Sequence, residues 1–227
     1  MGVCSGGGGC RLVGTGRNEG MVTLKLPFNT LVQKGVIALA GLLWVGFLLF
    51  HLAGNWLLLD TPGKYNRLAA TLTGWGWLFH AVEILLLAAL VVHGALAMAI
   101  ARSQRRFHRP HHRRWLVSWT SRWMVVTGPL VLVFLAVHLQ NFRLQPNRDL
   151  EFLVKHQFQS PVWLGFYELA LIPLGLHLAH GIGSSLQSLG VGHPRWTPHL
   201  PTWSAALSLL LMAGYALIPL ALYLPSR

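Results

Sequence analysis

The chain has 227 residues, of which 53% are hydrophobic and 11% are charged, and its mean hydropathy of +0.50 is too high for an ordinary soluble domain. Its formal net charge of +12 does not indicate nucleic-acid binding, because the basic residues lie beside apolar stretches and form no separate basic domain. The sequence lacks a Cys-x-x-Cys-His motif, which excludes covalent c-type haem. It also lacks a Walker motif and a dinucleotide-binding glycine fingerprint, so we do not expect nucleotide chemistry.

The first segment of the chain is rich in glycine and lacks the apolar core of a signal peptide. We expect residues 1–30 to form a disordered tail, or to begin upstream of the true translation start, for which Met21 is the candidate. Cys4 and Cys10 lie in this tail and are the only cysteines, so we expect neither a disulfide nor a metal site from them. Residues 31–227 are predicted to form a single domain.

Five stretches that are nearly free of charge follow this tail in chain order: 36–59, 75–101, 123–139, 162–186 and 203–224. Each approaches or exceeds the ~20 residues that a helix needs to cross a bilayer. Because lipid cannot satisfy open backbone groups, stretches of this kind cross a membrane as helices. The sequence therefore predicts an all-α membrane protein, a bundle of five transmembrane helices.

Basic residues between the predicted spans indicate how the chain crosses the membrane. The densest basic cluster joins the second and third spans, and a second one precedes the first span; the two comprise Arg102, Arg105, Arg106, Arg109, Arg113, Arg114, Arg11, Arg17, Lys25 and Lys34. Both should face the cytoplasm under the positive-inside rule. The N-terminus is then predicted to be cytoplasmic, in a multi-pass protein of the cell's inner (cytoplasmic) membrane.

Histidines lie deep within four of the five predicted spans: His51 on the first, His93 on the second, His138 on the third, and His177 with His180 on the fourth. An ionisable side chain inside a membrane is costly and therefore suggests a function, although a neutral imidazole bonded to a neighbouring helix is an alternative for any single one. A b-type haem needs two axial imidazoles from facing helices. Four donor helices are what two such haems require.

Helix geometry predicts how these histidines pair. His51 and His138 lie ~15 residues from the inner ends of outward-running spans, roughly 22 Å from the cytoplasmic face at a rise of ~1.5 Å per residue. His93 and His177 lie near the cytoplasmic side, because their spans run inward. We therefore expect an outer pair and an inner pair, on the order of 15 Å apart. His180, one turn beyond His177, remains an alternative ligand.

Glycines accompany these histidines, where either a macrocycle or close helix packing would need room: Gly41, Gly46, Gly54, Gly94, Gly128, Gly175, Gly181 and Gly183. Other polar residues are candidates for the second shell of the same sites. His80 could serve a haem propionate, a quinone or a helix contact, and Arg102 and Arg122 could pair with propionates or only fix the topology. Glu83 and Glu168 are the only carboxylates within the spans; burial would favour their protonated forms and make them proton donors to a quinone, unless their role is structural.

Four segments together resemble one family: HLAGN at residues 51–55, Glu83 ten residues before His93, TGPLVLVFLAVHLQNFR at residues 127–143, and HLAHGIGSSLQSLG at residues 177–190. They are similar to the type B cytochrome b subunit of succinate dehydrogenase and fumarate reductase. The resemblance covers residues 36–190 and includes the order and spacing of the four ligand positions.

This resemblance implies a single-chain, five-helix anchor that holds two non-covalent b haems and passes electrons to or from menaquinone or another quinone. The partners implied are a flavoprotein subunit and an iron–sulfur subunit on the cytoplasmic side. It also implies His177 rather than His180 as the fourth ligand, thirteen residues before Gly190. Related fumarate reductases carry a membrane glutamate where this chain has Gly175. The alternatives are a dihaem cytochrome b of another respiratory complex, of the hydrogenase or bc type, and a haem-free membrane anchor.

Overall fold

The computed structural model describes residues 30–107, 119–146 and 149–224, and the side chains of 31–103, 123–146 and 149–224. Residues 1–29 of the predicted tail and residues 108–118, with Arg109, Arg113 and Arg114, therefore lie outside the described residues, and so do the side chains of Arg105, Arg106 and Arg122. The described residues form helices only: α1 (Thr30–Trp56), η1 (Leu57–Leu59), α2 (Lys64–Gly74), α3 (Trp77–Phe107), α4 (Trp119–His138), η2 (Leu139–Arg143), α5 (Leu150–Phe158), α6 (Pro161–Ser188), η3 (Thr197–His199) and α7 (Leu200–Tyr223).

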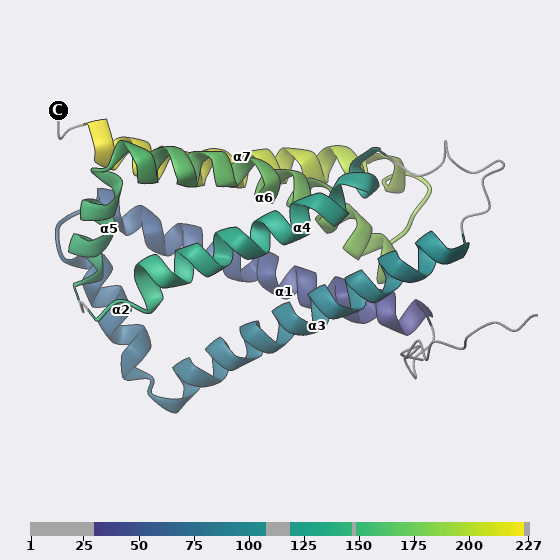
Figure 1. Cartoon of the computed structure of the whole chain (residues 1–227), viewed down its shortest axis with the longest axis horizontal. Helices are drawn as coiled ribbons and strands as arrows, with labels where there is room; N and C mark the ends of the chain where they lie inside the picture. The colour runs from purple at the N-terminus through teal and green to yellow at the C-terminus, as the bar shows by residue number, and fades with distance from the viewer. Residues whose placement is uncertain (1–29, 108–118, 147–148, 225–227) are drawn as a thin grey trace, which may run out of the picture.

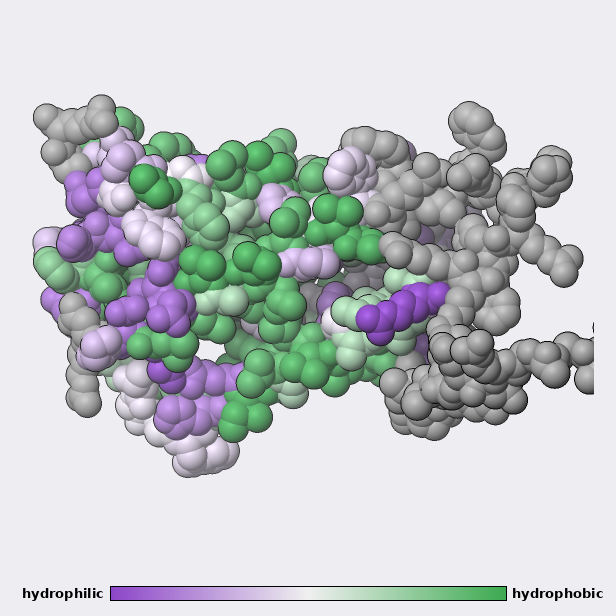
Figure 2. Space-filling model, in the orientation of Figure 1, coloured by the Kyte–Doolittle hydropathy of each residue, from purple (hydrophilic) through white to green (hydrophobic). Residues whose placement is uncertain are grey.

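Five of these helical stretches are long and apolar enough to cross a membrane, which confirms the predicted fold class. They comprise Leu31–Leu59, Trp77–Ser103, Trp123–Arg143, Pro161–Ser188 and Thr197–Tyr223. They run alongside one another (Figure 1), with α6 packed against α4 and α7, and α1 against α3 and α6. Large hydrophobic side chains cover the outside of the bundle, and Figure 2 shows them over its middle. Such a surface suits lipid, so the chain is a multi-pass membrane protein.

Two short helices, α2 and α5, lie across one end of the bundle, which we call the capped end (Figure 1). Their junction is polar: the carboxylate of Glu151 accepts hydrogen bonds from the backbone N–H of Gly63 at 2.8 Å and from Nζ of Lys155 at 2.7 Å. Asn66 on α2 donates to Asp149, the residue that caps the N-terminus of α5. The hydrogen bond from Lys155 keeps the pKa of Glu151 below its ordinary value although the side chain is buried.

Close packing of α6 against α7 depends on small residues. A Cβ at Gly175 would lie 2.9 Å from Cγ of Met212, and one at Gly183 would lie 2.8 Å from Oγ of Ser204. The hydroxyl of Ser208 also donates to the carbonyl of Gly175 at 2.7 Å. Of the two roles predicted for glycines, Gly175 and Gly183 therefore have the role of close helix packing.

Candidate functional site

Two pairs of histidines meet across the bundle, each between helices that are not neighbours in sequence. The ring of His51 on α1 lies 5.7 Å from that of His138 on α4, measured between ring centroids. The ring of His93 on α3 lies 6.2 Å from that of His177 on α6. We call these the α1–α4 pair and the α3–α6 pair. The structure thus brings together the residues that the sequence predicted to lie at common depths.

On both α1 and α4, ten residues separate the level of one histidine pair from the level of the other. A Cβ at Gly41 would lie 3.3 Å from Cε1 of His93, and His51 follows ten residues later on α1. A Cβ at Gly128 would lie 3.8 Å from Cε1 of His177, and His138 follows ten residues later on α4. Ten residues of helix rise by about 15 Å. Gly41 therefore lies tightly against the ring of His93, whereas a Cβ at Gly128 would make only an ordinary van der Waals contact with His177.

Hydrogen bonds fix which ring nitrogen carries the proton in the α3–α6 pair. Nδ1 of His93 lies 3.0 Å from the carbonyl oxygen of Ile37, and it must donate, because a carbonyl only accepts. Nδ1 of His177 lies 3.3 Å from Oγ1 of Thr127, whose own proton is donated to the carbonyl of Trp123 at 3.0 Å. With its own proton on the carbonyl of Trp123, Thr127 can accept the proton of His177 Nδ1. Both Nε2 atoms are left with a lone pair, which suits a metal ion between them.

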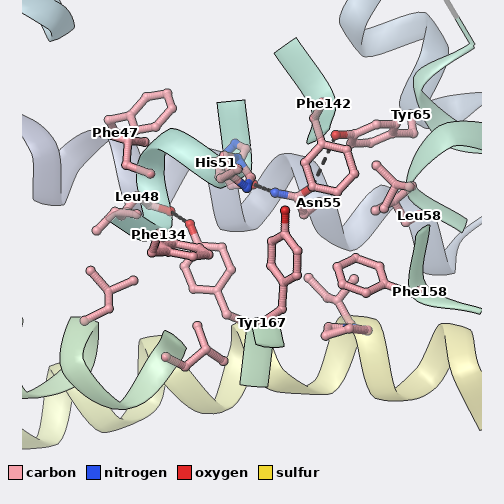
Figure 3. A pocket seen from close by; sticks show the side chains of 18 of the residues that line it. Phe47, Leu48, His51, Asn55, Leu58, Tyr65, Phe134, Phe142, Phe158 and Tyr167 are labelled. Atoms are coloured by element: carbon pink, nitrogen blue, oxygen red, sulfur yellow. Dashed lines mark hydrogen bonds between the residues drawn. The ribbon is translucent and has the colours of Figure 1, made fainter. Parts of the chain in front are cut away.

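The α1–α4 pair lies in a cavity of about 160 Å³ near the capped end, with mainly aromatic and aliphatic walls (Figure 3). His51 is stacked on Phe47, with ring centroids 5.3 Å apart, and His138 contacts Phe142 at 5.2 Å. The polar groups around it largely bond one another. The hydroxyl of Tyr65 donates to Asn55 at 3.2 Å, and Asn55 donates to the carbonyl of His51 at 2.8 Å.

Two buried polar atoms on the walls of this cavity have no hydrogen-bond partner among the described residues: Nδ1 of His138 and Nε1 of Trp44. Leaving a buried polar group unpaired costs about 1–3 kcal/mol, so native proteins rarely do so without a reason. A mostly apolar cavity with two imidazoles on its walls suits a mainly apolar ligand that carries a metal.

The donor set suits iron in a porphyrin better than a bare metal ion. No group of three or more His, Cys, Asp or Glu side chains that could hold a metal occurs in the described parts of the chain. Each histidine pair could supply two ligands to a metal whose remaining ligands came from a porphyrin. The ring centroids lie 5.7 Å apart in one pair and 6.2 Å apart in the other.

The remaining candidate residues occupy different surroundings. His180 lies one turn beyond His177 on α6 and is half-buried, whereas the ring contact with His93 is made by His177. Arg102 is exposed on α3, in the half of that helix farther from the capped end. Oε1 of Glu168 is buried on α6 with no partner among the described residues, as expected for an isolated carboxyl.

Glu83, for which the sequence left both proton donation and a structural role open, is paired with other side chains. Nε of Arg143 lies 2.6 Å from Oε1 of Glu83, and the second oxygen accepts from the same guanidinium at 3.0 Å. Nδ1 of His80 lies 3.1 Å from Oε2 of Glu83, so His80 makes a contact within its own helix. A two-bond pair with arginine stabilises the charged carboxylate rather than the protonated form that burial alone would favour.

Thr127, which contacts His177, and Arg143, which pairs with Glu83, were not recognised as candidate residues in the sequence. Both lie in the segment TGPLVLVFLAVHLQNFR, at its first and last positions, which is the signal that could have identified them. The arrangement as a whole offers two bis-imidazole sites at two depths of a membrane bundle, a geometry suited to moving single electrons across it. No family model, no curated protein and no solved structure matches the chain.

Proposed function

We propose that the chain is the dihaem cytochrome b subunit that anchors a succinate dehydrogenase or fumarate reductase, complex II, in the membrane. Its function is to carry electrons between an iron–sulfur subunit and menaquinone or a similar quinone. The observation that carries this proposal is the pairing of four imidazoles, two by two, from four spanning helices. The sequence segments that resemble the type B cytochrome b subunit support the choice of complex.

In this proposal His93 and His177 hold one b-type haem, and His51 and His138 hold the other. Bound haem supplies one-electron oxidation and reduction. The carbonyl of Ile37 and the hydroxyl of Thr127 hold the proton on Nδ1 in the α3–α6 pair, which would leave both Nε2 atoms with a lone pair for the metal. Aromatic and aliphatic walls around the α1–α4 pair exclude water and keep the imidazoles neutral.

The two ends of the bundle then have different partners. The N-terminus faces the cytoplasm, where the flavoprotein and iron–sulfur subunits dock, and Arg102 lies toward that side. The quinone binds toward the capped end, close to the α1–α4 pair. Arg143 and His80 hold Glu83 in its charged form there, and the carboxyl of Glu168, whose Oε1 has no partner in the described part of the chain, is the better store for a proton.

The test is to purify the full chain with its native partners, record a reduced-minus-oxidised spectrum and quantify haem. The proposal expects a b-type α-band, two haems per chain by the count of histidine pairs, and co-purification of a flavoprotein and an iron–sulfur protein. A chain that binds no haem is instead a passive anchor or a transporter. Two haems with other partners would indicate a hydrogenase-type complex. A bc-type protein is disfavoured, because it places two ligands about fourteen residues apart on each of two helices.

A further inference from the structure

Thr127 is the most deeply buried polar side chain next to a predicted ligand. Its side chain is only 2% exposed, on α4, and its hydroxyl donates to the carbonyl of Trp123 one turn earlier. The lone pairs of the same oxygen remain available, and one accepts the proton of His177 Nδ1 at 3.3 Å. The hydroxyl thus bridges a backbone carbonyl of one spanning helix and an imidazole of another.

Packing alone does not require a hydroxyl at this position. Valine has nearly the shape of threonine and is common in spanning helices, but it cannot accept a hydrogen bond. A hydrogen bond from Nδ1–H to an oxygen makes the imidazole a stronger electron donor through Nε2 and holds its orientation. A stronger donor stabilises oxidised iron more than reduced iron and lowers the reduction potential.

The α1–α4 pair has no equivalent of this contact. Nδ1 of His138, the ligand that α4 supplies to the other pair, is buried without a partner among the described residues. Thr127 lies eleven residues before it on the same helix, by sequence number. Helix α4 therefore places a hydroxyl next to the α3–α6 pair, whereas the imidazole that it contributes to the α1–α4 pair has no hydrogen bond at Nδ1 among the described residues.

We propose that Thr127 is a positioning residue: it fixes the tautomer of His177 and lowers the reduction potential of the haem held by His93 and His177, without affecting the other haem. This inference rests on the proposed function. It assigns this chain a means of setting the potentials of two haems separately, although both have the same axial ligands.

The test compares redox titrations of the full complex carrying either Thr127→Val or Thr127→Ser. The titrations are monitored through the haem α-band and by electron paramagnetic resonance. Thr127→Val should raise the midpoint of one haem, changing its ratio of oxidised to reduced forms about tenfold at fixed potential, equivalent to ~59 mV for one electron. Thr127→Ser keeps the hydroxyl and should keep the wild-type midpoint. Loss of one haem in Thr127→Val but not in Thr127→Ser would also support the assignment.

A matched control is Ser204→Ala. This hydroxyl is equally buried and donates to the carbonyl of Leu200 one turn earlier, like Thr127, but it belongs to the contact between α6 and α7. Its removal should leave both midpoints unchanged. The inference is overturned if Thr127→Val retains both haems at wild-type midpoints, or if Thr127→Ser and Thr127→Val shift them equally. A wild-type complex without haem would instead overturn the proposed function itself.

Discussion

The α3–α6 pair and the α1–α4 pair contain the same two side chains, but different forces hold the rings. In the α3–α6 pair, oxygen acceptors from Ile37 and Thr127 fix both Nδ1 atoms. In the α1–α4 pair, aromatic neighbours such as Phe47 fix the rings, and Nδ1 of His138 has no partner among the described residues. Hydrogen bonds select a tautomer, whereas packing selects only an orientation. The two pairs should therefore respond to different kinds of substitution.

The largest effect should come from removing one ligand. His177→Ala should lose about half of the bound haem, because the remaining His93 cannot hold iron alone in the α3–α6 pair. His180→Ala is the matched control on the same helix and should retain both haems, since the contact with His93 is made by His177. Haem content by pyridine haemochrome decides between them. Equal losses in the two variants would show that His180 shares the ligand role.

The second-largest effect should come from a substitution that fills the space beside one histidine ring, because it should disturb one pair and not the other. At Gly41 a Cβ would lie 3.3 Å from His93, so Gly41→Val should displace this ring and destabilise the fold by about 1–3 kcal/mol. The expected result is loss of one haem and a lower Tm. Gly46→Val lies on the same helix, where a Cβ meets no described atom within 4 Å. Identical haem content in the two variants would contradict a packing role for Gly41.

Substitutions at the capped end should disturb only the α1–α4 pair of histidines, because this pair lies near that end. Glu151→Gln removes the charge that Lys155 and the backbone of Gly63 bind, a loss of about 1–3 kcal/mol. The pKa of Glu151 lies below its ordinary value. Its contribution to stability is therefore complete above the unfolded pKa of about 4.3 and is lost as the pH falls through the folded value.

Hydrogen exchange in α2 and α5 measures this effect directly. Acidification below pH ~4 should increase exchange in these helices in the wild type more than in Glu151→Gln. Asp60→Asn is the control, because Asp60 pairs with Lys64 on the exposed surface of the same end. If acid loosened α2 and α5 equally in the wild type and in Glu151→Gln, another group would be responsible.

The smallest change in stability is expected at the ion pair between Glu83 and Arg143. Half of the Arg143 side chain is exposed, so Glu83→Gln should cost no more than about 1 kcal/mol. Its informative readout is quinone turnover with the haem spectrum intact. Reduced turnover in Glu83→Gln, with normal turnover in His80→Ala, would assign the role to the carboxylate. Unchanged turnover in Glu83→Gln would remove Glu83 from proton transfer.

Properties that depend on distance along a helix were predictable from the sequence. The rise per residue is nearly constant, so the depths of His51 and His138 could be compared without knowing how the helices pack. The third span was predicted to end at residue 139 because polar residues follow, but its helical backbone continues through η2 to Arg143. The short helices α2 and α5 were not predicted, because neither is apolar enough to be recognised as a span.

Contacts that depend on rotation about a helix axis were not predictable. The hydrogen bond between Thr127 and His177 and the ion pair between Glu83 and Arg143 each join residues at least fifty positions apart. Whether such residues face each other depends on the packing of the intervening helices. For the same reason the sequence left two roles open for both Glu83 and Glu168, and only the structure shows that Glu83 is paired whereas Oε1 of Glu168 has no partner among the described residues.

The shared ten-residue interval on α1 and α4 has a mechanical consequence. A helix resists stretching along its axis far more than its neighbours resist sliding sideways, because every turn is tied by backbone hydrogen bonds. Breathing of the bundle in lipid can therefore widen or narrow each histidine pair while the spacing between the pairs hardly changes. A single residue inserted between Gly41 and His51 would turn one site by about 100° relative to the other, so the pairing of the four histidines depends on this register.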